Sequence, residues 1–419
     1  MTAAVVADAR PANGLPAYAV FGATLAAAGL PIYIHAPKYY VDEYGVSLAA
    51  LGAVLFGLRL LDVVQDPVLG WLSERTRLVR SGAVAIALIV LAVSMIGLFA
   101  VTPPVAPLLW FGLTLTGLFS SFSFLTITFY AEGVEKAARI DGGHVRLAAW
   151  RETGALLGVS LAAMAPTVLA AASGRPFAAF AAAFAGLVVV AGFAMRREWG
   201  MSTRTDPGPG IGTVLADPVA RRLLLLALVN ATPVAVTSTL FLFFVESRLE
   251  APGWEGPLLL LFFLAAAASA PLWGVVAGRI GPRRALILGM VLAIVTFGFA
   301  LTLGPGDTLA FAIICLASGA ALGADMTLLP ALFARRMARI APDAGQAFGL
   351  WNFVTKFTLA FAAVALFPVL DAAGFRSGAE TMPSEALWTL TLLYAALPCA
   401  LKLIAVALLA TLKMDDADR

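Results

Sequence analysis

Charged side chains are scarce in this sequence, since Asp, Glu, Lys and Arg make up only 13% of its 419 residues. A soluble globular protein is about one quarter charged and about half apolar. This chain is 61% apolar, with a mean hydropathy of +0.92. The shortage of charge therefore excludes an ordinary soluble domain and indicates a protein that crosses a membrane many times.

Cysteine and histidine are nearly absent, with two residues of each. Cys315 and Cys399 fall inside long apolar runs, where a thiol is more often a small apolar filler than a disulfide partner or metal ligand. Two histidines offer no cluster for a transition metal. The chain also lacks a Ser-His-Asp set and a glycine-rich nucleotide loop, so we expect no enzyme, no cofactor and no ATP-driven step.

Apolar runs of about 20 residues, the length that crosses a bilayer core, recur along the whole chain. The abundance of Gly and Ala favours packed helices over a β-barrel, because small residues let membrane helices approach closely. We predict an all-α polytopic membrane protein with twelve spans, at residues 15–35, 47–72, 83–102, 107–131, 147–171, 177–195, 222–246, 257–278, 284–303, 308–333, 347–369 and 386–411.

Lys and Arg are distributed unequally between alternate loops. With the N-terminus inside, 20 of the 28 lie in cytoplasmic segments and four in outer loops. This asymmetry predicts that both termini are cytoplasmic. The net charge of +3 then faces an anionic inner leaflet, so we expect the lipid bilayer as a partner and no nucleic acid. No signal-peptide pattern opens the chain, and we expect a multi-pass protein of a bacterial inner membrane.

The longest cytoplasmic loop carries a Pro/Gly run at 207–210 and divides the spans six and six. Similar basic loops, starting at Gly70 and Gly274, follow the second and eighth spans and suggest two related halves. Basic loops alone would also satisfy the positive-inside rule. We predict two six-helix bundles, an N-terminal one at 15–195 and a C-terminal one at 222–411. A cytoplasmic central loop at 196–221 joins them, and cytoplasmic tails lie at 1–14 and 412–419.

The stretch "RLLDVVQDPVLGW" (59–71) places charges inside the second span. A spacing of four puts Asp62 and Asp66 on one helical face, and Arg59 shares that face. Pro67 has no backbone N–H, so one carbonyl of the preceding helical turn loses its hydrogen bond. A hydrated cavity can supply the missing donor. Two close carboxylates suit either a hard cation such as Na⁺ or a proton. Alternatively, Arg59 neutralises Asp62 and only anchors the helix; buried charges in spans are by default functional.

Further charges lie inside other spans, and we predict that they face one cavity. Arg151 begins the fifth span beside Glu152, a possible local partner. Lys356 lies about mid-bilayer in the eleventh span, too deep to reach the interface. Asp325, late in the tenth span, could form a gating salt bridge with a loop arginine or contact substrate. Lys402, in the twelfth span, has no assigned role.

The twelve spans, the long central loop and the matched loops resemble the major facilitator superfamily. Three stretches resemble one branch, the glycoside–pentoside–hexuronide cation symporters related to melibiose permease. They are the stretch at 59–71, the stretch "HVRLAAWRETGALLG" at 144–158 with Arg151, and the pair 324–334 and 345–375, which carries Asp325, Lys356 and a closing Leu370-x-x-x-Gly374.

This resemblance implies that the coupling cation binds at Asp62 and Asp66 and that Lys356 lies near the cation and the substrate. In melibiose permease, acidic residues on helices 1 and 4 hold the sugar; the matching positions here are Thr24 and Thr126. A lone hydroxyl replaces a carboxylate poorly for vicinal diols, so sugar transport is doubtful. We group Thr126 with the predicted cation or proton site.

Polar and aromatic residues in the spans are candidates for lining the substrate cavity. Asn and Thr also bond across helices, and Trp and Tyr also mark interfaces or cores, so each has an alternative structural role. The candidates are Thr24, Tyr130, Asn230, Thr237, Trp351 and Asn352, with Trp351 and Asn352 favoured because they lie near Lys356 in sequence.

We therefore predict a secondary active transporter, a monomer that carries a small organic solute by cation-coupled symport and alternating access. Na⁺, H⁺ or Li⁺ could couple. The alternatives are a proton-coupled exporter of amphipathic or drug-like compounds, a lipid carrier, and a non-transporting membrane receptor or assembly factor. The last alternative predicts that neutralising Asp62, Asp66 and Lys356 leaves function intact.

Overall fold

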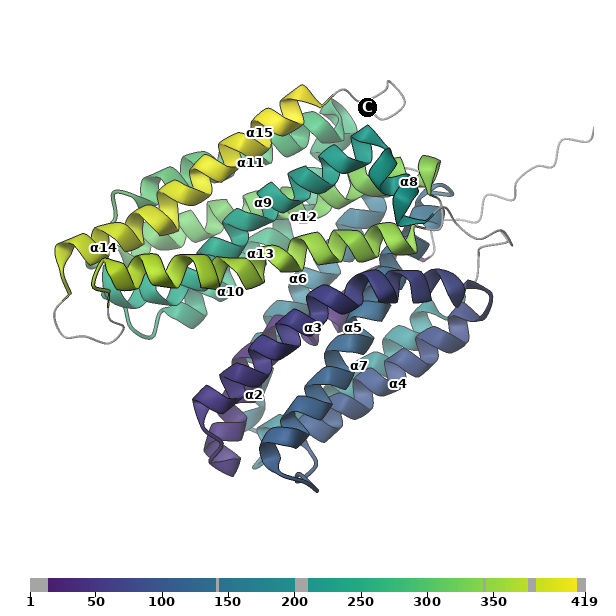
Figure 1. Ribbon diagram of the computed structural model, residues 1–419, viewed down its shortest axis with the longest axis horizontal. Helices are drawn as coiled ribbons and strands as arrows, with labels where there is room; N and C mark the ends of the chain where they lie inside the picture. The colour runs from purple at the N-terminus through teal and green to yellow at the C-terminus, as the bar shows by residue number, and fades with distance from the viewer. Residues whose placement is uncertain (1–13, 141–142, 200–209, 342–343, 376–381, 413–419) are drawn as a thin grey trace, which may run out of the picture.

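The computed structural model describes residues 14–140, 143–199, 210–341, 344–375 and 382–412 (Figure 1). Within these ranges the regular structure is entirely helical. The helices are α1 (Leu15–Ala27), α2 (Leu30–Tyr44), α3 (Leu48–Arg75), α4 (Arg80–Phe99), α5 (Pro107–Ala137), α6 (Gly143–Ala170), α7 (Pro176–Met195), α8 (Ile211–Ala216), α9 (Pro218–Phe243), α10 (Glu255–Ile280), α11 (Pro282–Ala300), α12 (Thr308–Ile340), α13 (Gly345–Ala372), α14 (Ser384–Thr391) and α15 (Leu397–Thr411).

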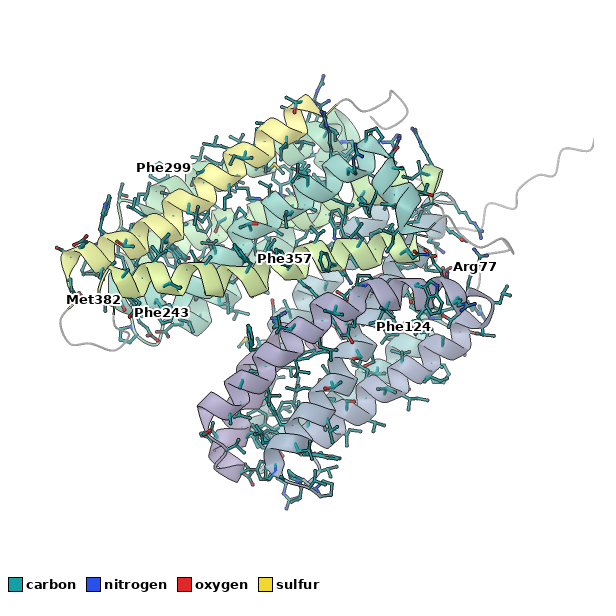
Figure 2. All side chains as sticks on the ribbon, viewed as in Figure 1. Arg77, Phe124, Phe243, Phe299, Phe357 and Met382 are labelled. Atoms are coloured by element: carbon teal, nitrogen blue, oxygen red, sulfur yellow. The ribbon has the colours of Figure 1, made fainter. Side chains whose placement is uncertain are left out.

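Nine helices within the described ranges are long and apolar enough to cross a membrane. Large apolar side chains stand on the outer faces of the molecule, as Phe299 does with 60% of its surface exposed (Figure 2). An apolar outer face is expected where lipid, not water, surrounds the helices. The predicted all-α polytopic fold is confirmed.

The first predicted span, at 15–35, is wrong as a single helix. The chain breaks between α1 and α2, where Gly29 leaves the helical region with φ −91° and ψ −114°. Pro31 follows in the first turn of α2, and it has no backbone N–H to donate to the carbonyl of residue 27, so a continuous helix would lose a hydrogen bond here. Gly29 and Pro31 together therefore explain the break in the apolar run.

Two helices of the C-terminal part widen into single π-helical turns. The turn Phe244–Arg248 continues α9, and the turn Leu392–Ala396 joins α14 to α15. Phe244 stacks on Tyr394 with ring centroids 4.1 Å apart, so the two turns pack against each other. Turns of this kind are rare and are frequent at functional sites.

The helices form two bundles, α1–α7 (the N-half) and α9–α15 (the C-half), with short α8 between them (Figure 1). Helix α3 packs on α13 and α6 packs on α10, which joins the halves. Figure 1 shows that α3 and α13 approach each other near α8 and diverge away from it. We call this end the α8 end and the opposite one the distal end.

Glycines make the contact between α3 and α13. A Cβ on Gly70 would lie 2.8 Å from the carbonyl oxygen of Gly345, and a Cβ on Gly349 would lie 2.7 Å from the carbonyl oxygen of Asp66. Side chains do not fit at such distances, so the two helices touch backbone to backbone, as small residues allow in membranes.

Polar contacts close the α8 end around these glycines. Glu74 of α3 accepts hydrogen bonds from the backbone N–H of Gln346 at 2.8 Å and from its side-chain amide at 2.5 Å. The side-chain oxygen of Gln346 accepts from the backbone N–H of Ile211 in α8 at 3.1 Å. Gln346 of the C-half thus contacts both α3 of the N-half and α8, the short helix between the halves.

Asp217 caps the start of α9 beside this closed end. Its carboxylate accepts from the backbone N–H of Ala220 at 2.7 Å and from Arg336 of α12 at 3.0 Å and 2.5 Å. Partial burial acts to raise the pKa of Asp217, but the hydrogen bonds from Arg336 and Ala220 outweigh it and hold the pKa below its usual value. The charged carboxylate therefore stabilises the α9–α12 contact.

Candidate functional site

Two carboxylates lie buried on one face of α3, in the N-half. Asp62 is 4% exposed and Asp66 is fully buried. The spacing of four residues predicted this shared face, and the structure adds the cation opposite them. Lys356 comes from α13, in the other half, and its Nζ lies 3.1 Å from Asp66 Oδ2 and 3.7 Å from Asp62 Oδ1. This ion pair therefore spans the two halves of the protein.

Helix α5 supplies polar groups to the same cluster. Lys356 donates a hydrogen bond to Ser123 Oγ at 2.6 Å and another to Asp66 Oδ1 at 3.2 Å. Gln65 donates to Asp62 Oδ1 at 2.8 Å and accepts from Ser120 at 2.9 Å. Sequence reasoning missed the α5 serines, although hydroxyls repeated at a spacing of three in the run "SSFS" (120–123) were a usable signal.

Among the described residues, the buried Thr126 Oγ1 on α5 has no hydrogen-bond partner, and Asp66 Oδ2 on α3 has an ion pair with Lys356 but no hydrogen bond. Buried polar groups are normally paired, so the unpaired Thr126 hydroxyl suggests a missing water or ion. Carboxylate and hydroxyl oxygens are the ligands that hard cations prefer. The group of α3 and α5 oxygens can therefore hold a small monovalent cation or a proton.

Arg59 lies half-buried on α3, about one turn before Asp62. Position alone does not separate its two predicted roles, anchoring the helix and belonging to the charge network. Both stay predictions.

Arg151 belongs to a second cluster, at the contact of α5 and α6. Its Nε lies 2.8 Å from Glu152 Oε1, the predicted local partner, and its guanidinium stacks 3.5 Å above the Tyr130 ring. The Tyr130 hydroxyl donates to the same Glu152 oxygen at 2.7 Å. The Tyr130 ring also packs against Phe348 of α13, at a centroid distance of 5.3 Å, so this cluster too touches the C-half.

A third cluster lies inside the C-half. Asp325 of α12 forms an ion pair with Lys402 of α15, so its partner is not the loop arginine offered as one alternative. Asn230 of α9 accepts a second hydrogen bond from Lys402, at 2.6 Å. Apolar periodicity could not reveal this pair, because 77 residues separate its members. The described contacts divide the in-span charges among three clusters, and one cavity shared by all of them stays a prediction.

The other predicted substrate residues lie outside these clusters. Thr24 donates to the backbone carbonyl of Val20 in its own helix at 2.8 Å. Trp351 is buried and packs on Phe333 at 4.8 Å, which is a core contact. Asn352 is half-buried on α13, one turn before Lys356. The structure thus gives Thr24 and Trp351 local partners, and it places Asn352 one helical turn from Lys356 on α13.

Comparisons with known proteins agree with this architecture. A family model described as MFS/sugar transport protein matches residues 15–416, and the chain belongs to this family of membrane transporters. No curated protein matches the chain.

Solved transporters share the fold. A bacterial homologue of the iron transporter ferroportin in an outward-facing state is similar, with a TM-score of 0.70 and 15% identity, covering 94% of this chain and 98% of that chain. A structure with soaked iron has a TM-score of 0.71 and 16% identity, covering 94% of this chain and 98% of that chain. A variant of the E. coli fucose:proton symporter has a TM-score of 0.65 and 12% identity, covering 96% of this chain and 98% of that chain. These likenesses show a shared fold, and the family match identifies it as the major facilitator fold.

Proposed function

We propose that this protein is a cation-coupled secondary active transporter that binds Na⁺ or H⁺ at Asp62 and Asp66. One observation carries the proposal: two buried carboxylates of the N-half share a single ammonium that comes from the C-half. Those three groups together carry one net negative charge. Intramembrane charges arranged in this way are functional by default.

Competition explains how a bound cation would be coupled to movement. A cation at Asp62 and Asp66 takes the oxygens that now contact Lys356, so it weakens a contact between the halves. A ligand shifts a conformational equilibrium only by its differential affinity for the two states, and this competition supplies the difference. Occupancy of the site would therefore bias the relative arrangement of the halves, as alternating access requires.

The resemblance to the glycoside–pentoside–hexuronide symporters supports this function, and the family match supports transport. We propose symport of a small organic solute, without a cofactor, by a monomer in a bacterial inner membrane. The excess of Lys and Arg supports a cytoplasmic location for the α8 end. The halves approach each other at that end, so we propose that the structure represents an outward-facing state.

Thermal unfolding of the purified protein in Na⁺, Li⁺, K⁺ and a pH series tests the cation site. We expect selective stabilisation by one cation, about 2.7 kcal/mol at a hundredfold excess over Kd, that disappears in Asp66→Asn. Asp371→Asn, an exposed carboxylate on α13, is the matched control and should keep the response.

A response to pH alone that shifts in Asp66→Asn would assign proton coupling. If wild type and Asp66→Asn behave alike in every condition, the cation site is refuted.

A further inference from the structure

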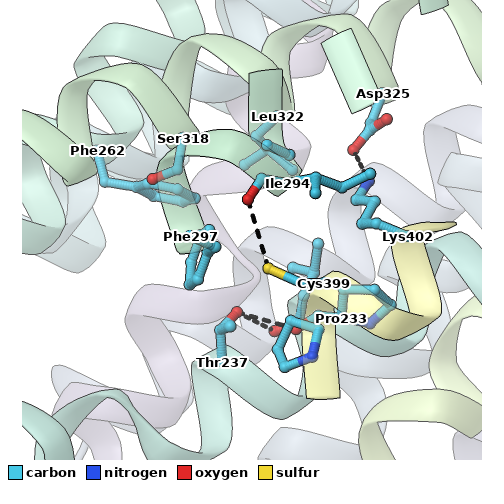
Figure 3. A pocket seen from close by; sticks show the side chains of 13 residues that line it. Pro233, Thr237, Phe262, Ile294, Phe297, Ser318, Leu322, Asp325, Cys399 and Lys402 are labelled. Carbon is cyan, nitrogen blue, oxygen red and sulfur yellow. Dashed lines mark hydrogen bonds and ion pairs between the residues drawn. The ribbon is translucent and has the colours of Figure 1, made fainter. Parts of the chain in front are cut away.

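Two arginines at the start of α11 are charges that the proposed cation site does not use. The buried pair of Asp325 and Lys402 in the same half lies beside an enclosed cavity of about 50 Å³, which has room for only a few water molecules (Figure 3). Arg283 and Arg284 lie instead at the surface of the α8 end, where Arg283 is half-buried and Arg284 is exposed. A ligand from outside the bundle can therefore reach them.

A groove of about 630 Å³ separates the start of α11 from the end of α15, within the range of about 300–1,000 Å³ typical of ligand sites. Arg283 and Arg284 line it on the α11 side, and Ala410 lines it on the α15 side. Figure 1 shows α11 and α15 side by side along an outer edge of the C-half. Exposed Leu288 and Ile404 on these helices indicate that this edge faces lipid.

The two guanidiniums have N–H donors to spare. Arg283 donates one hydrogen bond, to the Ala410 carbonyl at 2.6 Å, which holds its side chain across the groove. Arg284 has no hydrogen-bond or ion-pair partner among the described residues. A guanidinium has five donors in a planar fork that matches a phosphate group. The groove therefore offers donors to an oxygen-rich anion.

Further positive charge surrounds the groove. Arg222, at the start of α9, donates to the Thr411 carbonyl at 3.3 Å, one residue after Ala410. Arg279, in the last turn of α10, is exposed. Asp217, the acidic residue at the start of α9, is already paired with Arg336. An anion is therefore attracted to this corner of the molecule.

An apolar stripe on α11 continues from the arginines toward the distal end. Leu288, Val291, Val295 and Phe299 follow Arg284 at intervals of three and four residues, so all five share one face of the helix. The four apolar side chains are 51%, 42%, 53% and 60% exposed, and Figure 2 shows Phe299 on the outside of the molecule. A ligand that matches this face has an anionic head and a long apolar chain.

We propose that the groove between α11 and α15 binds one anionic phospholipid of the cytoplasmic leaflet. Its phosphate would accept hydrogen bonds from Arg283 and Arg284, and one acyl chain would lie along the stripe from Leu288 to Phe299. A choline head group would bring a cation toward the arginines, so the site favours a net negative head group. Basic pockets between helices on the cytoplasmic side bind anionic lipids in this way.

The bound lipid would join two outer helices, because Arg283 contacts both its phosphate and the end of α15. This inference goes beyond the proposed transport function and does not depend on the cation at Asp66. Lipid binding can therefore be measured without transport.

Native mass spectrometry of the full-length protein in detergent tests the proposal. The probes are dioleoyl phosphatidylglycerol and dioleoyl phosphatidylcholine, which share their chains and phosphate and differ in net charge. One arginine beside an anionic lipid contributes about fivefold in affinity, so two should give phosphatidylglycerol a preference of roughly 10- to 30-fold. Arg283→Gln combined with Arg284→Gln should reduce the preference to below about threefold.

Two matched controls separate the groove from general attraction. Arg196→Gln combined with Arg197→Gln removes the same charge from an exposed pair just after α7 and should keep the preference. Leu288→Gln, on the stripe, should weaken phosphatidylglycerol binding, whereas Leu242→Gln, equally exposed on α9, should not. If both arginine pairs matter equally, or both leucines do, the proposal is overturned.

Two other occupants of the groove are outcomes of the same experiment. Glycerol 3-phosphate carries the head group without chains, and binding as tight as that of the lipid would assign a site for free phosphate and overturn the proposal. Truncation after Leu412 removes Asp415, Asp416 and Asp418, which lie outside the described residues. Phosphatidylglycerol binding should then be unchanged or stronger. A preference seen only after truncation would show that the tail fills the groove, and would also overturn the proposal.

Discussion

Replacing Lys356 with methionine should tighten cation binding at Asp62 and Asp66, because it removes the positive charge that competes for the same oxygens. Lys356 Nζ lies 3.1 Å and 3.7 Å from the two carboxylates. At these distances it occupies the space beside both of them, so a cation could bind there only by displacing it. The Lys356 side chain is only 15% exposed, so water screens this competition weakly. Lys356→Arg keeps the charge and is the matched control.

The size of the effect follows from the distances. Two unit charges about 4 Å apart interact by about 4 kcal/mol at an effective dielectric constant near 20. Relaxation and desolvation reduce this, so we expect about 1–3 kcal/mol, or roughly 5- to 150-fold tighter binding, within the usual range of coupling between sites. Without cation, the variant should be less stable by about 3–5 kcal/mol, because two carboxylates lose their buried partner.

Both effects can be read from one series of thermal unfolding curves, recorded against cation concentration and pH. The Tm of Lys356→Met should be lower without cation and should rise more when cation is added. If the coupling ion is a proton, the carboxylates of Asp62 and Asp66 should keep it to higher pH. If the half-saturating cation concentration in Lys356→Met equals or exceeds that in Lys356→Arg, Lys356 does not compete for the site and the reasoning is wrong.

Three further predictions concern the contacts that hold the bundles. Gly349→Ala should destabilise the α3–α13 contact by about 1–3 kcal/mol through overpacking, measured by unfolding, whereas Gly57→Ala on α3, with nothing within 4 Å, should not. Asp217→Asn keeps a good helix cap but loses the charge that accepts hydrogen bonds from Arg336, and should cost about 0.5–2 kcal/mol at neutral pH. Because the folded-state pKa is lowered, the Tm difference from wild type should vanish as the pH falls through it, and a constant difference would contradict this. Glu132→Gln breaks the buried ion pair with Arg80 of α4 and should lower the free energy of unfolding by about 3–5 kcal/mol. Glu135→Gln breaks a half-exposed pair at 4.0 Å and should lower it by under about 1 kcal/mol.

The sequence predicted the helical membrane fold because apolar runs of spanning length are a local signal, read one segment at a time. It also predicted that Asp62 and Asp66 share a face, since four residues make about one helical turn. The break at Gly29 was missed because hydropathy continues across it, although Pro31, which has no backbone N–H, was a usable signal.

Partners between distant helices could not be predicted from periodicity. Lys356 was expected near the aspartates only through the family resemblance, and the Ser123 contact came from the structure alone. Lys402 had no assigned role, because helical spacing says nothing of which helix α15 faces. Long-range pairing depends on how the bundles pack, and one sequence carries little information on that.

The glycine contact between α3 and α13 has a consequence for the speed of conformational change. Where side chains interdigitate, parting two helices means repacking each of them, which makes the barrier high. Gly70, Gly345 and Gly349 present bare backbone, so parting them breaks no interlocked packing. The barrier to opening the α8 end then depends on the contacts beside these glycines, such as the hydrogen bonds of Glu74 to Gln346 and the contact of Tyr130 with Phe348. Single substitutions at Glu74, Gln346 or Phe348 should therefore change the opening rate.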